Sequence, residues 1–306
     1  MHTAAARPGR SGGDKTYPVA EADELLSFLL KTVTNQGRNS LKSMLARGQI
    51  EVDGRSVTAY DYMLQPGQTV TLRKEAPAEK LPLAAMTILY EDDDIIVIHK
   101  EAGLLSISAG DKADNQELTA YRQLTAHVRV VNPHARIFVV HRLDRDTSGV
   151  MMFAKSEEIQ QKLQNEWQDI VKERTYVALV EGKVRKAEDT ITSWLKETKT
   201  LLMYSSQHPN DGQYAVTRYK TLQTTSDFSL LEVQLETGRK NQIRVHMADI
   251  GHPIVGDKKY GSRSRAIGRL GLHARVLSFE HPRTGKLMRF ETDIPRLLLR
   301  PFQSKA

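Results

Sequence analysis

The feature that most restricts how this chain can fold is a series of short apolar segments, each bounded by turn-forming residues. Beyond about residue 86 these segments are rich in strand-forming residues and are mostly too short for helices. The strands predicted there are 87–90, 95–98, 137–140, 150–154, 174–180, 215–222 and 228–236. Because these strands outnumber the helices and follow one another like hairpins, we predict an α+β fold with a mixed, largely antiparallel sheet flanked by helices and loops.

Three segments of the same region have helical periodicity instead. Residues 116–130 form one amphipathic pattern, Ser156 can cap a second helix, and residues 241–250 predict a short helix that stops at Gly251. The apolar faces of the first two helices are expected to consist of Leu118, Tyr121, Leu124 and Val128, and of Ile159, Leu163 and Trp167.

A smaller α+β unit precedes this region. Two helical patterns, of which the second runs into Gly48, are followed by a hairpin with its turn at Asp53-Gly54 and by a strand at 69–73. The apolar positions of the two helices are Leu25, Leu29 and Val33, and Leu41, Met44 and Leu45. The predicted organisation is a disordered tail (1–16), a small domain (17–74), a polar, proline-bearing linker (75–85) and a large domain (86–301).

Composition excludes several kinds of protein. The chain has no cysteine, so disulfides and thiolate metal sites are excluded. It contains no apolar run of the ~20 residues needed to span a bilayer, and its amino terminus lacks the apolar core of a secretory signal. We therefore expect a cytoplasmic protein that is not bound to a membrane. The formal net charge of +7 favours an anionic partner such as nucleic acid, although many basic proteins bind none.

Two polar clusters are candidates for chemistry. Residues 141–149, His-Arg-Leu-Asp-Arg-Asp-Thr-Ser-Gly, follow a predicted strand and place the carboxylate of Asp144 between two arginines, which favour its ionised form. Residues 238–246, Gly-Arg-Lys-Asn-Gln-Ile-Arg-Val-His, place cations at the start of a helix, where phosphate could bind. Taken alone, the first cluster is more simply a charged β-turn, and the second is equally compatible with a solvated basic face.

The two clusters together resemble segments of a known family, the large-ribosomal-subunit type of RNA pseudouridine synthases. HRLDRDTSG looks like the signature that contains the catalytic aspartate of this family. ILYEDDDIIVIHKEAGLLS, KERTYVALVEG, GRKNQIRVHMADIGHPIVGDKKYG and LGLHARVLSFEHP resemble further family segments, in the same order and at similar spacing. The resemblance covers essentially residues 86–301 and implies an isomerase that flips a uridine out of structured RNA and converts it to pseudouridine.

The resemblance implies roles for five residues. Asp144 corresponds to the nucleophile, Arg244 to the arginine that pairs with it, and Tyr176 to the tyrosine that packs against the flipped base and assists proton movement at C5. Arg142 corresponds to the arginine that fills the gap left in the RNA, and Leu272 either packs on the uracil or belongs simply to the core. Whether Asp144 attacks C1′ of the sugar or C6 of the base stays open.

The small leading domain resembles the RNA-binding domain named after ribosomal small-subunit protein four. Arg38, Lys42 and Arg47 lie on or beside its second helix, the face that such domains use against RNA; the alternative is that they are ordinary exposed charges. Arg239 and Lys240 are further candidates for RNA contacts. The resemblance favours large-subunit ribosomal RNA as the partner, and we expect the protein to act as a monomer.

The implied reaction is an isomerisation, which consumes nothing, so we expect no metal, no nucleotide and no redox cofactor. The sequence contains none of the motifs GxxxxGK[ST], GxGxxG and HExxH that would argue otherwise. Two positions depart from the family pattern. Lys240-Asn241 stands where threonine-histidine is common, and Lys100-Glu101 stands where lysine-proline is common, which concerns loop geometry and RNA contacts more than the chemistry.

Other functions compete with this interpretation. A non-catalytic RNA-binding or ribosome-assembly factor could share the fold, although intact Asp144, Tyr176 and Arg244 argue against it. A glycosidase using Asp144 and Asp146 is less compatible, because near-adjacent loop carboxylates rarely lie about 5–9.5 Å apart across a sugar. A metal-dependent nuclease is also conceivable, although residues 91–94 more simply make a hairpin turn. The carboxylates available to such a nuclease would be Asp92, Asp93, Asp94, Asp144 and Asp146.

Overall fold

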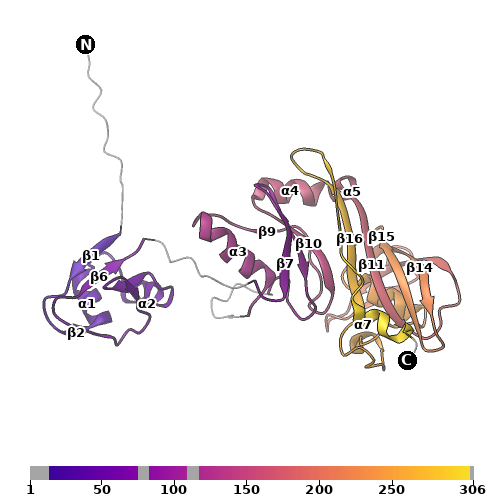
Figure 1. The fold of residues 1–306 in the computed structure, drawn as a ribbon, viewed down its shortest axis with the longest axis horizontal. Coiled ribbons are helices and arrows are strands. Elements are labelled where there is room, and N and C mark those ends of the chain that lie inside the picture. Colours follow the sequence, from indigo (N-terminus) through magenta and orange to yellow (C-terminus); the bar gives the residue numbers. More distant parts are fainter. Residues whose placement is uncertain (1–13, 75–82, 109–116, 304–306) are drawn as a thin grey trace, which may run out of the picture. The chain divides into compact units, whose positions relative to one another are not determined.

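The structure is a computed structural model of the chain and describes residues 14–74, 83–108 and 117–303. The chain divides into two compact units, Met1–Lys80 and Leu81–Ala306 (Figure 1). Most of the predicted tail (1–16) and of the predicted linker (75–85) lies outside the described residues, as does the beginning of the helix expected at 116–130.

The first unit combines two helices with small antiparallel sheets. Helices α1 (Leu25–Thr32) and α2 (Arg38–Ala46) confirm the two helical patterns. Chain reversal after α2 uses Gly48 at a φ of 68°, a left-handed conformation that glycine adopts without steric cost. The strands are β1 (Lys15–Pro18), β2 (Asp23–Glu24), β3 (Ile50–Val52), β4 (Arg55–Ser56), β5 (Met63–Leu64) and β6 (Thr69–Leu72). β1, β6, β3 and β4 form one sheet in that order, and β2 pairs with β5.

The predicted hairpin in this unit is confirmed at its turn. Asp53 and Gly54 have φ values of 49° and 77°, as a two-residue turn between β3 and β4 requires. The Asp53 carboxylate also accepts a hydrogen bond from the backbone amide of Thr69, 2.8 Å away, and so ties the turn to β6. The apolar faces of both helices pack on the sheet and form a separate core, whose fully buried members are Leu25, Leu29, Leu41, Ile50, Leu64 and Val70.

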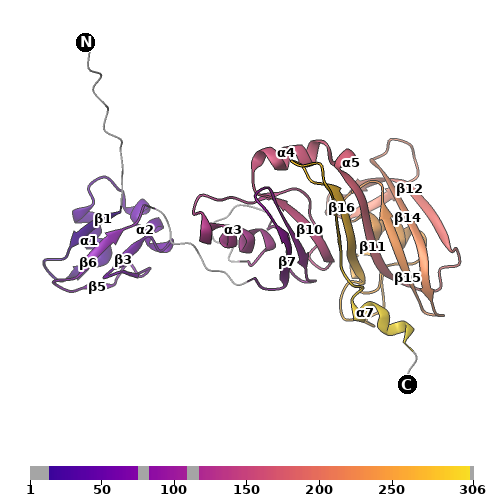
Figure 2. The same cartoon turned by 45° about the horizontal axis from the view of Figure 1, so that its top comes forward.

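The second unit is built on a mixed, largely antiparallel sheet, as the sequence predicts, although the sheet has eleven strands instead of the seven predicted. Its strands are β7 (Met86–Glu91), β8 (Ile95–Lys100), β9 (Phe138–Val139), β10 (Ser148–Ala154), β11 (Val171–Glu181), β12 (Glu188–Glu197), β13 (Met203–Ser206), β14 (Gln213–Thr224), β15 (Phe228–Leu235), β16 (Leu272–Glu280) and β17 (Leu287–Glu291). Nine of them follow the order β13-β12-β14-β15-β11-β16-β10-β8-β7, while β17 pairs with β16 and β9 with β10. Figure 2 shows β11, β15, β14 and β12 side by side.

Helices cover the sheet of the second unit on both faces. They are α3 (Ala120–Val131), α4 (Glu157–Asn165), α5 (Trp167–Ile170), α6 (Gln242–Asp249) and α7 (Arg296–Leu299), with 3-10 turns η1 (Lys258–Tyr260) and η2 (Arg300–Phe302). Side chains of α3 pack on one face of β8 and β10, and side chains of α4 pack on the other face. The helices α6 and α7 cover opposite faces of β11 and β15 in the same way. Because helices bury both faces of β8 and β10, consecutive residues of these strands are apolar, which explains the continuous apolar runs in their sequences.

Several predicted boundaries were wrong. The strand expected at 137–140 is only the two-residue β9, because the chain turns into a polar loop directly after it. Leu118 lies before α3, whose first turn is capped by the hydroxyl of Thr119, and Trp167 begins α5 instead of ending α4. In the second unit the sequence patterns also missed β12, β13, β16, β17 and α7.

The two halves of the large sheet meet at β10 and β16, its one parallel pair among the described residues. The pairing is short and joins Ser148 to His273 and Gly149 to Ala274. Gly149 has a φ of 122°, and a β-carbon there would lie 2.0 Å from the carbonyl oxygen of Ala274. Only glycine therefore lets β10 approach β16 this closely.

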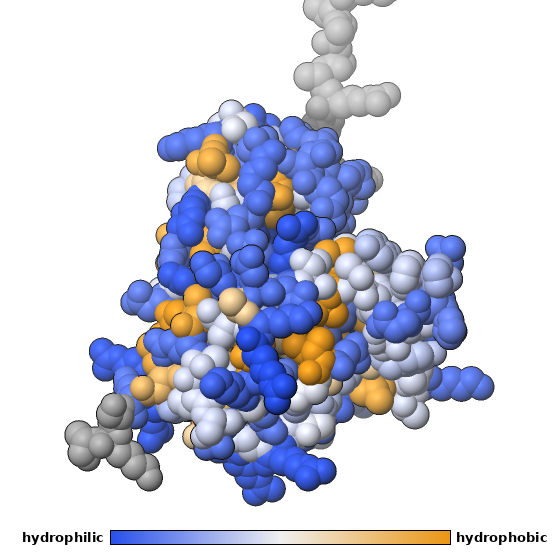
Figure 3. Space-filling model, turned by 90° about the vertical axis from the view of Figure 1, so that its right-hand side faces the viewer, coloured by the Kyte–Doolittle hydropathy of each residue, from blue (hydrophilic) through white to orange (hydrophobic). Residues whose placement is uncertain are grey.

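No helix among the described residues is long and apolar enough to cross a membrane. On the face drawn in Figure 3, hydrophobic residues form separate small areas among hydrophilic ones.

Candidate active site

Asp144 lies on the loop between β9 and β10, and the protein fixes this loop on both sides of the carboxylate. On one side the hydroxyl of Ser106 donates to the carbonyl of Leu143 at 2.7 Å and accepts from its amide at 3.2 Å. On the other side the carbonyl of Arg145 accepts from the amide of Gly103 at 2.9 Å. The loop is therefore held in one backbone geometry while its polar side chains stay accessible, as a reactive loop requires.

Lys100, at the end of β8, also holds this loop from within the protein. Its side chain is fully buried, and its ammonium donates to the carbonyls of Glu101, Leu104 and Arg145 at 2.8–3.0 Å. Burial lowers the pKa of Lys100 to about 8, against the opposing effect of the nearby Asp146 and Asp144 charges. At Lys100-Glu101, where the family commonly has lysine-proline, the lysine is therefore a structural residue beneath the loop.

Arg244, on the first turn of α6, faces Asp144 across the junction of β10 and β16. Its Nη1 donates to Oδ2 of Asp144 at 2.9 Å. Its Nε and Nη2 donate to the two oxygens of Asp257 at 2.7 and 2.8 Å, a bidentate pair that fixes the plane of the guanidinium. Burial opposes the charged form, yet the carboxylates of Asp257 and Asp144 together raise the pKa of Arg244 above its usual value. The guanidinium is thus a permanent cation with a set orientation.

Tyr176 and Leu272 complete a small cavity beside this ion pair. Tyr176 comes from β11 and Leu272 from β16, and neighbouring strand positions bring them together. Burial raises the pKa of Tyr176, so the phenol is protonated at neutral pH. The cavity has a volume of about 80 Å³. Its lining includes Arg142, Asp144, Tyr176, Arg239, Asn241, Arg244 and Leu272.

The structure therefore brings together the residues predicted for the reaction centre, and of the predicted RNA contacts in the second unit it places Arg239 beside them but not Lys240. Arg142 and Arg239 are exposed and line the cavity. Lys240 points elsewhere and forms an ion pair with Glu197 of β12. The remaining three cations, which lie in the first unit and are exposed, are Arg38, Lys42 and Arg47.

Sequence reasoning missed three residues around this site. Asp257 is buried and clamps Arg244, and the ring of Tyr260 lies 5.0 Å from the guanidinium carbon of Arg244. Asn241 contacts the Asp144 carboxylate directly. All three lie in the segment that resembles the family. In the sequence, however, Asp257 is a single acidic residue next to lysines, and this pattern does not indicate that it is buried against Arg244.

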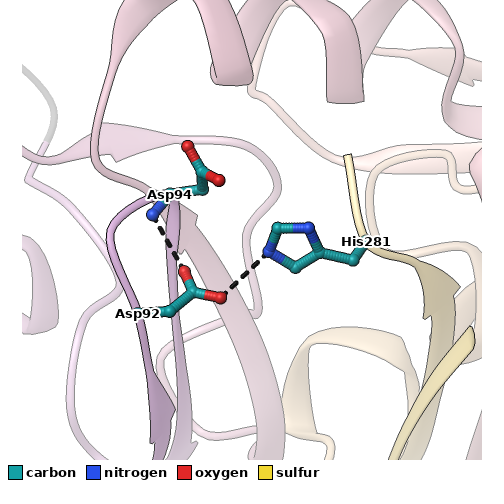
Figure 4. Close-up of side chains that lie close together, drawn as sticks. All are labelled: Asp92, Asp94 and His281. Carbon is teal, nitrogen blue, oxygen red and sulfur yellow. Dashed lines mark hydrogen bonds and ion pairs between the residues drawn. The ribbon is translucent and has the colours of Figure 1, made fainter. Parts of the chain in front are cut away.

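The acidic turn considered for a nuclease is occupied by protein donors (Figure 4). Asp92 accepts hydrogen bonds from the amides of Asp94 and Ile95 and from the ring of His281. Both oxygens of Asp94 accept from the guanidinium of Arg283 at 2.7–2.9 Å. These bonds tie the β7–β8 turn to the β16–β17 turn, which gives the acidic cluster a structural role.

Comparison with known proteins agrees with this geometry. The family model described as RNA pseudouridylate synthase matches residues 94–249. The chain is 35% identical over 280 residues to an uncharacterized RNA pseudouridine synthase of Bacillus subtilis (strain 168), YlyB, covering 90% of this chain and 91% of that protein. It is also 35% identical over 282 residues to ribosomal large subunit pseudouridine synthase D of Vibrio cholerae serotype O1, covering 86% of this chain and 85% of the relative.

A solved structure supports the fold. Human RNA pseudouridylate synthase domain containing 4 superposes with a TM-score of 0.56 at 24% identity, over 70% of this chain and 91% of that one. With relatives of this identity along most of its length and a matching family model over half of it, the chain belongs to the RNA pseudouridine synthases, enzymes that isomerise uridine to pseudouridine in RNA.

Proposed function

We propose that this enzyme acts on a uridine of large-subunit ribosomal RNA and that Asp144 is its nucleophile. The observation that carries the proposal is the Asp144–Arg244 ion pair, at 2.9 Å, in a cavity walled by Tyr176 and Leu272. Segments far apart in the chain supply these four groups, and they meet only in the fold. The choice of RNA is supported by the relatives named ribosomal large subunit pseudouridine synthase D.

The two oxygens of the Asp144 carboxylate accept different hydrogen bonds. With the Asn241 amide turned so that its oxygen accepts from Tyr260, Oδ2 accepts from Arg244 at 2.9 Å and from the Asn241 nitrogen at 2.8 Å, whereas Oδ1 has only the longer 3.3 Å contact to Asn241. Donors lower the electron density of the oxygen they bind, so Oδ1 is the better nucleophile. In our proposal Oδ1 forms the transient bond to C1′ or C6, and the N1–C1′ bond breaks. C5 then bonds to C1′, the carboxylate leaves, and the proton lost from C5 is balanced by one gained at N1.

The walls of the cavity suit a flipped uracil. The ring of Tyr176 and the side chain of Leu272 offer apolar surface to the base, and the protonated phenol can donate a hydrogen bond or relay a proton, although it provides no standing phenolate. Arg142, exposed at the rim, would fill the space that the base leaves in the RNA. Arg239 would contact the phosphates nearby.

We also assign RNA binding to the first unit. Lys42 lies 5.4 Å from the ring centre of Tyr60, which is itself 57% exposed, so a cation and an aromatic face occur together beside α2. This combination suits phosphate and base contacts. The proposed enzyme works as a monomer without a nucleotide cofactor, because one chain supplies every wall of the cavity and the reaction rearranges bonds within one nucleotide.

The test is to map pseudouridine in RNA from cells with and without the gene. We expect one or a few pseudouridines of large-subunit ribosomal RNA to disappear and to return with the wild-type gene but not with the Asp144→Asn variant. Loss confined to transfer RNA would refute the choice of RNA, and return of the modification with Asp144→Asn would refute the nucleophile.

A further inference from the structure

Asn241 occupies an unusual place beside the proposed nucleophile. It is the residue before α6 and has a φ of 53°, a left-handed conformation that asparagine tolerates better than most residues. This conformation turns its side chain back toward Asp144 instead of capping the helix, since the side chain makes no capping hydrogen bond.

The direction of the Asn241 amide follows from its two neighbours, Tyr260 and Asp144. The Tyr260 hydroxyl accepts a hydrogen bond from the backbone amide of Met203 at 3.2 Å, so its own proton is available to a second acceptor. The carbonyl oxygen of Asn241 lies 2.8 Å away and accepts it. The amide nitrogen then faces Asp144, at 2.8 Å from Oδ2 and 3.3 Å from Oδ1. The opposite orientation would place the amide oxygen against a carboxylate that can only accept.

We infer, resting on the proposed function, that Asn241 and Tyr260 form a positioning pair that orients the Asp144 carboxylate for attack. The chain of hydrogen bonds runs from β13 through Tyr260 and Asn241 to Asp144, in addition to the Asp257–Arg244 clamp, to which Tyr260 is joined by its own backbone amide. Two donors at fixed directions determine the rotation of a carboxylate, whereas Arg244 alone leaves it free to turn about that bond.

An amide donor has a property that an ionisable donor would lack. It keeps its proton at every pH at which the enzyme is folded, so Oδ2 stays engaged and Oδ1 stays free whatever the acidity. An aspartate in place of Asn241 would lie at hydrogen-bond distance from Asp144, and two such carboxylates share a proton. The pH dependence of catalysis therefore reports directly on this contact.

The experiment measures single-turnover tritium release from large-subunit ribosomal RNA transcripts labelled at C5 of uridine, with enzyme in excess and at saturation. For Asn241→Ala we expect the rate constant to fall by about 10- to 100-fold, as for a lost hydrogen bond to a charged group, while the RNA dissociation constant changes less than about twofold. For Asn241→Asp the acidic limb of the pH–rate profile should move up by about one pH unit or more. Asn241→His, which restores a donor, should recover part of the rate.

A double-mutant cycle separates positioning from general loosening of the fold. Tyr260→Phe keeps the ring over Arg244 but removes the hydroxyl, and it should slow the wild type by about three- to tenfold while adding little to Asn241→Ala. Asn210→Ala is the matched control, because Asn210 is exposed and has a similar φ of 62° outside the cavity.

The possible outcomes distinguish failure of the Asn241–Tyr260 positioning pair from failure of the proposed function. The positioning pair is refuted if Asn241→Ala keeps its rate within about twofold of wild type, if the Asn241→Asp profile overlays that of the wild type, or if the two substitutions are additive. Absence of wild-type turnover on this RNA would overturn the proposed function, and the inference with it.

Discussion

Replacing Asp144 by asparagine should separate catalysis from stability more cleanly than any other change in this protein. The amide has the shape of the carboxylate but no charge, and it cannot form the transient bond to the substrate. The structure limits the cost to folding, because Arg244 keeps its bidentate pair with the buried Asp257 after the change. The arginine is therefore never left as an unpaired buried charge.

The expected magnitudes follow from these contacts. The Asp144 side chain is 31% exposed, so losing its ion pair should lower the free energy of unfolding by less than about 1 kcal/mol and the melting temperature by less than about 4 °C. Loss of a nucleophile typically slows an enzyme by about four to six orders of magnitude, or roughly 5–8 kcal/mol in the activation barrier. RNA affinity should stay nearly unchanged, since the residues proposed to contact phosphates do not include Asp144.

Tritium release from C5-labelled RNA gives the rate, thermal melting gives the stability, and filter binding gives the affinity. Asp146→Asn is the matched control: it removes a carboxylate from the same loop, but Asp146 is exposed and does not line the cavity, so its rate should stay within a few-fold of wild type. Activity of Asp144→Asn within about tenfold of wild type, a barrier change of only ~1.4 kcal/mol, would exclude Asp144 as the nucleophile.

Three further outcomes are expected. Activity should survive excess chelator; loss that magnesium restores, with the RNA shown to remain folded, would show that the isomerisation requires a metal ion. Deleting residues 1–74 should leave an active second unit whose RNA affinity falls and whose slope of log K against log salt decreases by about two to three units, as for about three lost phosphate contacts; an unchanged slope would mean that the first unit does not touch RNA. Finally, acid should destabilise the fold, because burial lowers the pKa of three histidines to about 3–4, namely His141, His246 and His273. They are neutral when folded but protonate below about pH 6.5 when unfolded, so their contribution is complete above pH 6.5 and is lost as pH falls toward 4, by up to about 1.4 kcal/mol per pH unit each. Urea unfolding at pH 7.5 and 5 measures this, and equal stability at both values would contradict it.

Local chemistry explains which parts of the fold were predictable. The turn at Asp53-Gly54 and the ends of α2 and α6 could be predicted because each needs a positive φ, which single residue types such as glycine indicate in the sequence. By contrast, β12 was missed because its inward positions include Ser193, a buried polar residue whose hydroxyl bonds to His246 of α6. A polar residue on the inner face hides the alternation that identifies a strand.

The candidate site shows the same division. The resemblance indicated Asp144, Tyr176 and Arg244, and the structure brings these residues together; their roles stay predictions until tested. The Asn241–Tyr260 contact could not be read from the sequence, because it depends on a left-handed residue and on a backbone amide of β13. Such contacts depend on tertiary placement to within a fraction of an ångström.

The short parallel contact between β10 and β16 has a consequence for how activity can be lost. Asp144 precedes β10, whereas Arg244 and Tyr176 belong to the strands and helix beyond β16, so the reaction centre spans the joint between two half-sheets. Widening that joint by one methyl group at Gly149 would separate the nucleophile from its cation without altering either side chain. We therefore expect an alanine at position 149 to lower activity although it changes no residue of the reaction centre.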